Sequence, residues 1–129
     1  MSVSAPESRH RLLENLPVTE RTLTLAGIKT PVLHGGSGTP VILLHGPGGY
    51  AAHWLRVIPE LVKHHQVIVP DLPGHGESDA SNVELDVGRA RKWLGELIER
   101  CCTSPPQVVG QVLGGAMAAR FAARNGGRI

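Results

Sequence analysis

Aromatic side chains are scarce in this sequence and make up only 3% of its 129 residues. They are Trp54, Trp93, Tyr50 and Phe121, so a hydrophobic core has to be built mainly from aliphatic side chains. Long apolar runs are missing as well, because no run approaches the roughly 20 residues that a membrane-spanning helix needs. We therefore expect no membrane-bound function.

Charge is also limited, with 19% charged residues and a formal net charge of +2. The basic residues are spread along the chain instead of forming one stripe, which argues against a nucleic-acid-binding protein. The seven histidines show no metal-ligand spacing, and only His64 and His65 are adjacent. Two glycine-rich motifs that bind phosphate groups, GxxxxGK and a strand-linked GxGxxG, are both absent from the sequence. We expect no metal, no cofactor and no nucleic-acid partner.

Cysteine occurs only at the neighbouring positions Cys101 and Cys102. Adjacent cysteines seldom satisfy disulfide geometry, so both are expected to be reduced thiols. The first eleven residues contain no apolar segment of the kind found in signal peptides. These two observations favour a cytoplasmic protein.

A chain of this length accommodates one domain. Residues 1–19 are polar and aperiodic, with Pro6 and Pro17, and are expected to form a flexible N-terminal arm. Within this arm Leu12, Leu13 and Leu16 suit one helical turn that docks on the rest of the chain. Residues 20–129 form the core domain.

The core shows a regular alternation of strand and helix patterns. Residues 21–26 and 31–34 read as a hairpin around Gly27, and continuous apolar runs of the type buried in parallel sheets follow later. The buried apolar runs are residues 41–44, 66–70 and 107–112. The helical patterns are residues 50–65, 86–101 and 113 onwards, and we expect the first of them to break at Pro59. This order predicts an α/β fold, with a mostly parallel sheet of five strands, an antiparallel start and helices on both faces.

Three loops follow the three buried strands, at the edge where open α/β sheets hold ligands. In the first, His45-Gly46-Pro47-Gly48-Gly49, glycines let backbone N–H groups approach a ligand, as an oxyanion hole requires. Proline has no N–H, so Gly48 is the better donor. The alternative is a plain strand-to-helix turn. In the second loop, residues 71–78, Asp71 and His75 suit an acid–base pair, but a self-stabilised turn is the favoured interpretation.

The third loop joins a short strand to a helix of small residues. Gly110 and Gly114 stand two residues before and two residues after Val112. This spacing is typical of a sharp turn that presents a nucleophile between two glycines. Val112 has no hydroxyl group.

Together the three loops, HGPGG, DLPGHGES and GQVLGG, resemble those of the α/β-hydrolase family over residues 20–127. Small esterases, haloperoxidase-like proteins and meta-cleavage-product hydrolases look most similar. The resemblance implies a serine hydrolase that cleaves ester, amide or C–C bonds of a small acyl-type substrate. It implies that Val112 occupies the nucleophile position and that Gly48 and Leu113 supply the oxyanion hole. The cleft and the nucleophile-bearing turn would then contain His45, Gly46, Pro47, Gly49, Gly110, Gln111 and Gly114.

Two departures from the family pattern predict that the chain is catalytically inactive. Valine replaces the nucleophilic serine, and the acid and histidine of the family come from later strands, whereas the sequence ends at Ile129. We therefore expect a truncated core that corresponds to the N-terminal half of the family fold. A ligand-binding or scaffold module is one alternative function. One subunit of a split hydrolase, completed by a partner chain, is another.

Two structural expectations follow from the same resemblance. Val112 either relaxes to ordinary strand geometry or keeps the positive φ of a nucleophile position, which is strained for a β-branched residue. Residues 107–112 become an exposed edge strand if no further strand pairs with them, and this edge favours self-association or a completing chain.

Overall fold

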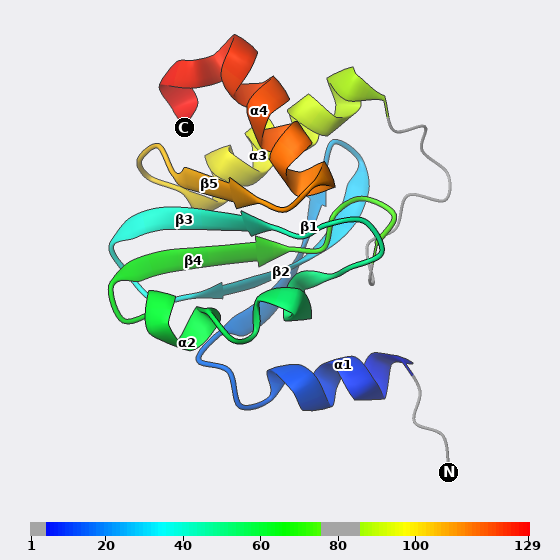
Figure 1. The fold of residues 1–129 in the computed structure, drawn as a ribbon, viewed down its shortest axis with the longest axis vertical. Helices are drawn as coiled ribbons and strands as arrows, with labels where there is room; N and C mark the ends of the chain where they lie inside the picture. The colour runs from blue at the N-terminus through cyan, green and yellow to red at the C-terminus, as the bar shows by residue number, and fades with distance from the viewer. Residues whose placement is uncertain (1–4, 76–85) are drawn as a thin grey trace.

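The computed structural model describes residues 5–75 and 86–129, and a mixed five-stranded sheet lies at the centre of this part of the chain (Figure 1). The strands are β1 (Thr19–Leu25), β2 (Ile28–Gly35), β3 (Thr39–Leu44), β4 (His65–Pro70) and β5 (Gln107–Gly110). Their spatial order is β1-β2-β4-β3-β5. β2 is antiparallel to β1 and to β4, whereas β3 is parallel to β4 and to β5. The predicted α/β fold with an antiparallel start is confirmed.

The central strands are buried on both faces. In β3, Val41 and Leu43 belong to the hydrophobic cluster on one face of the sheet, and Ile42 and Leu44 belong to the cluster on the other face. β4 repeats this alternation. Successive side chains of a strand point to opposite faces, so an unbroken apolar run contributes side chains to the hydrophobic clusters on both faces of the sheet.

Helices cover both faces of the sheet (Figure 1). One face carries the long helices α3 (Val87–Cys101) and α4 (Leu113–Asn125), and the other carries α1 (Ala5–Leu13), the 3-10 helix η1 (Ala51–Trp54) and α2 (Ile58–Leu61). A short 3-10 helix, η2 (Gly126–Arg128), follows α4. In the part of the chain that the structure describes, no helix is long and apolar enough to cross a membrane.

α3 forms as the sequence predicts. Asp86 caps its N-terminus, because the Asp86 side chain accepts a hydrogen bond of 2.7 Å from the backbone N–H of Arg89. The apolar stripe of the helix is buried, and the indole N–H of Trp93 donates to the Thr30 hydroxyl at 3.0 Å. This bond satisfies a polar group inside the core and fixes α3 against β2.

The helical pattern over residues 50–65 forms two short pieces, η1 and α2, separated by a turn. The expected break is present, and Pro59 lies in the first turn of α2 as expected. In the N-terminal segment, α1 is longer than the single helical turn predicted. Leu13 and Leu16 pack on the cluster that contains Val41, which is the docking that the sequence predicts. The flexibility of residues 1–19 stays a prediction.

Candidate functional site

The three loops singled out in the sequence meet at one edge of the sheet. β3, β4 and β5 are parallel, so their carboxyl ends lie together, and residues 45–49, 71–75 and 110–115 follow these ends. The backbone N–H of Gln111 donates to the carbonyl of Leu44 at 3.0 Å, which joins the third loop to the end of β3. The remainder of the second loop, residues 76–78, lies outside the described residues.

Glycine is required in the sharp turn between β5 and α4. A Cβ atom at Gly110 would collide with the backbone of Gly114 and Gly115, and one at Gly114 would collide with the carbonyl of Leu44. The turn is closed by a hydrogen bond of 3.0 Å from the N–H of Gly114 to the carbonyl of Gln111. The turn therefore holds the start of α4 directly against β3 and β5.

Val112 stands at the tip of this turn with φ 51° and ψ −99°. The second of the two predicted geometries is therefore present: the valine keeps a positive φ and does not relax to strand geometry. A positive φ is unfavourable for a β-branched residue and costs about 1–3 kcal/mol. The side chain is 74% exposed, so little burial offsets the strain.

The two backbone groups predicted to form an oxyanion hole are those of Leu113 and Gly48. Leu113 is the first residue of α4, where N–H groups have no partner within the helix. Gly48 is exposed and has φ 73°, a conformation that glycine adopts readily. Pro47 is exposed beside it and has no N–H to donate. The roles of Gly48 and Leu113 as donors remain predictions.

His45 is completely buried and does not face the open side of the loops. Its Nδ1–H donates to the carbonyl of Gly46 at 2.8 Å, and its Nε2 accepts from the N–H of Leu72 at 2.9 Å. This pattern requires the neutral ring, in agreement with burial, which lowers the pKa of His45. His45 therefore connects the first loop to the second, and its place in a ligand-binding cleft stays a prediction.

The remaining residues of the first loop complete a tight turn against the third loop. The N–H of Gly49 donates to the carbonyl of Gly46 at 3.1 Å, and Gly46 is buried beside Gln111. A Cβ atom at Gly46 would lie 3.4 Å from the Gln111 carbonyl oxygen. The first and third loops are thus in contact, and Gln111 itself is exposed.

Asp71 and His75 both have hydrogen-bond partners in the loops, which favours a structural role for them. Asp71 is buried, and its Oδ1 accepts a hydrogen bond of 2.8 Å from the N–H of Ala51, at the start of η1. The Nδ1 of His75 lies 3.1 Å from the carbonyl oxygen of Pro73. The sequence identified Asp71 as a turn residue but did not reveal that it fixes η1, because its partner lies 20 residues away.

No group of three or more histidine, cysteine, aspartate or glutamate side chains within residues 5–75 and 86–129 is arranged to hold a metal ion. Cys101 and Cys102 are both free thiols. Burial raises the pKa of Cys101, and burial together with Cys101 raises the pKa of Cys102 to about 11. Both thiols are therefore protonated and unreactive at neutral pH.

Comparisons with known proteins agree with the geometry of the three loops. A family model described as alpha/beta hydrolase fold matches residues 39–129. The 2-hydroxy-6-oxo-6-(2'-aminophenyl)hexa-2,4-dienoic acid hydrolase of Metapseudomonas resinovorans is 35% identical over 101 residues, which are 75% of this chain and 35% of that protein. The 2-hydroxymuconate semialdehyde hydrolase of Pseudomonas sp. (strain CF600) is 35% identical over 125 residues, or 90% of this chain and 42% of that protein.

Solved structures show the same likeness. The crystal structure of a bacterial membrane phospholipase A superposes with a TM-score of 0.84 and 26% sequence identity, and the match covers 97% of this chain and 41% of that one. In each of these three comparisons the chain spans less than half the length of the similar protein.

Proposed function

Because this chain belongs to the alpha/beta hydrolase fold family, we propose that it is a non-hydrolytic member whose sharp turn presents a valine in place of a nucleophile. The observation that carries this proposal is Val112 itself. It stands between Gly110 and Gly114 with a positive φ and a side chain that is 74% exposed. The positive φ supports the assignment of a nucleophile position, and valine supplies none of the chemistry of a nucleophile.

The chemical argument rests on the missing hydroxyl. A serine hydrolase forms an acyl-enzyme through a serine Oγ, and a valine side chain has no atom that can attack a carbonyl carbon. Loss of one member of a catalytic triad leaves only substrate binding and the oxyanion hole, which corresponds to a rate loss of about 10⁴ to 10⁶. We therefore infer that Gly48 and Leu113 bind ligands without turnover.

Hydrolysis of p-nitrophenyl esters and labelling by a serine-directed fluorophosphonate probe test this proposal. We expect the purified chain to show no saturable hydrolysis of the esters and to give no labelled peptide in mass spectrometry. The Val112→Ala variant is the matched control, because it also lacks a hydroxyl and should behave identically. Saturable hydrolysis by the chain, or a probe adduct on any of its residues, would contradict the proposal.

A second candidate function is that of a subunit completed by another polypeptide. β5 pairs with β3 on one side and has no partner strand on its other side among the described residues. Val109 in this strand is 45% exposed. An unpaired strand with an apolar side chain favours pairing with a second chain, either another copy or a completing partner. Sedimentation velocity of the purified chain tests for such association.

A further inference from the structure

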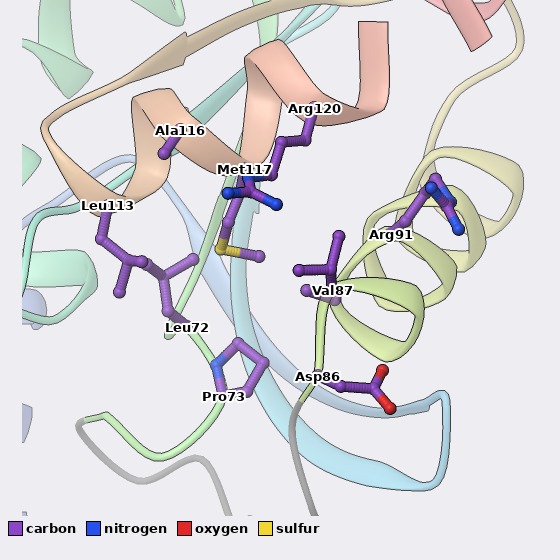
Figure 2. A pocket seen from close by; sticks show the side chains of 10 residues that line it. Leu72, Pro73, Asp86, Val87, Arg91, Leu113, Ala116, Met117 and Arg120 are labelled. Atoms are coloured by element: carbon purple, nitrogen blue, oxygen red, sulfur yellow. The ribbon is translucent and has the colours of Figure 1, made fainter. Parts of the chain in front are cut away.

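A hollow of about 290 Å³ lies between the first turns of α3 and α4, beside the turn that carries Val112 (Figure 2). α4 lines it with residues that share one face of the helix, because Leu113, Ala116, Met117 and Arg120 follow helical spacing. α3 and the loop after β4 supply the rest of the wall. Val112 and residues 45–49 do not line this hollow, whereas Leu113 does, so the hollow adjoins one of the two predicted oxyanion-hole donors.

The middle of the hollow is apolar. Figure 2 shows Met117 from α4 and Val87 from α3 pointing toward one another, with Leu72 and Leu113 beside them. Val87 is 48% exposed and Leu113 is 38% exposed, so both present apolar surface to water. Covering such surface with the hydrocarbon part of a ligand is favourable.

The charged residues are placed at opposite ends of the hollow. Arg91 and Arg120 lie at the end that is upper in Figure 2, and Asp86 lies at the lower end. Neither guanidinium group has a hydrogen bond or an ion pair with another part of the described chain. Asp86 is already engaged, because its carboxylate accepts from the N–H of Arg89.

We propose that this hollow binds a small apolar carboxylate. The hydrocarbon part lies between Met117 and Val87, and the carboxylate is bound by Arg120. The volume is at the lower end of the range of about 300–1,000 Å³ that is usual for ligand pockets, which favours a short-chain acid over a long lipid. Binding involves no covalent step, so this inference does not depend on whether the chain hydrolyses esters.

Titration of the isotope-labelled chain with octanoate, followed by NMR, tests the proposal. We expect saturable shifts at Val87, Leu113 and Met117, with a dissociation constant of about 1 mM or tighter. Octylamine and octanol have the same hydrocarbon chain without the negative charge. We expect both to bind about tenfold or more weakly than octanoate, because a hydrogen bond to a charged group contributes that much.

Two exposed arginines on α4 provide a matched pair of variants. Arg120→Gln should weaken octanoate binding about tenfold while leaving octanol binding unchanged. Arg124→Gln, one helical turn further along and outside the hollow, should leave both unchanged. Ala116→Phe fills the hollow and should abolish the octanoate shifts, and its amide spectrum shows whether the fold is retained.

Three results would overturn the proposal. They are equal binding of octanoate and octylamine, equal losses in Arg120→Gln and Arg124→Gln, and octanoate shifts that centre on residues 45–49 instead of the hollow.

Discussion

Val112 combines two features that are rarely found together, a β-branched side chain and a φ of 51°. The neighbouring glycines explain why the strain persists. Gly110 and Gly114 pass so close to other backbone atoms that a wider turn would separate α4 from β3 and β5. The packing of the surrounding elements therefore holds one residue in an unfavourable conformation. In this turn the Val112 side chain stays exposed to solvent.

Val112→Gly is expected to stabilise the fold by about 1 kcal/mol, because it removes the positive-φ strain at the cost of extra freedom in the unfolded chain. Urea unfolding followed by circular dichroism measures the change. Val109→Gly is the control, since Val109 lies in β5 at ordinary strand geometry, and this variant should lose stability. A loss of stability in Val112→Gly would show that the turn is not strained.

Among the elements, α3 contacts parts of the chain that are far from it in the sequence, and no local sequence pattern predicts these contacts. Its buried stripe packs on the sheet, and Arg89 donates to the carbonyl of Ala26 in the turn between β1 and β2 at 2.6 and 2.9 Å. Glu96 accepts from the N–H of Ala26, which has a φ of 50°. The helix thus holds the strained turn of the hairpin as well as one wall of the hollow.

Asp86→Ala removes the N-terminal cap of α3 and should lower the free energy of unfolding by about 1 kcal/mol. Thermal or urea unfolding of the purified variant provides the measurement. Asp86→Asn keeps an acceptor for the N–H of Arg89, so it should stay close to the wild-type stability. If the asparagine and alanine variants are equally destabilised, the effect does not come from capping.

At the scale of the whole molecule, the sheet has two very different borders. β1 is held by its hairpin with β2 and by contacts with α3, whereas β5 has only four residues, Gln107–Gly110, and pairs with β3 alone within the described chain. Val57 and Val109 are both exposed on the side of a groove next to β5. The open border and the apolar groove lie together, which favours an interface at this place.

Val109→Lys should shift the chain toward the monomer, because lysine on an edge strand disfavours pairing with another strand. Sedimentation velocity at about micromolar concentrations, the range in which such contacts form, measures the mass distribution. Thr22→Lys in β1, at an exposed position of the opposite border, is the control and should not alter association. A wild-type chain that is monomeric at every concentration would rule out association through β5.

Local sequence patterns predicted much of the fold. The buried runs of β3 and β4, the amphipathic stripe of α3 and its cap at Asp86 all depend on residues close together in the sequence. The glycine spacing around Val112 also predicted the sharp turn at the start of α4. The full length of the helix over residues 5–13 was not predicted, because its composition is polar and Leu13 and Leu16 pack on a hydrophobic cluster of residues that are distant in the sequence.

The sequence by itself determined that the residue between Gly110 and Gly114 is a valine without a hydroxyl group, because side-chain chemistry does not depend on folding. Only the tertiary structure decided that this valine keeps a positive φ, since the close approach of Gly110, Gly114 and Leu44 imposes the turn. Only the fold buried His45 as a connection between two loops, because Leu72 is brought to it from 27 residues away. The hollow between α3 and α4 has the same origin, as its two arginines come from different helices.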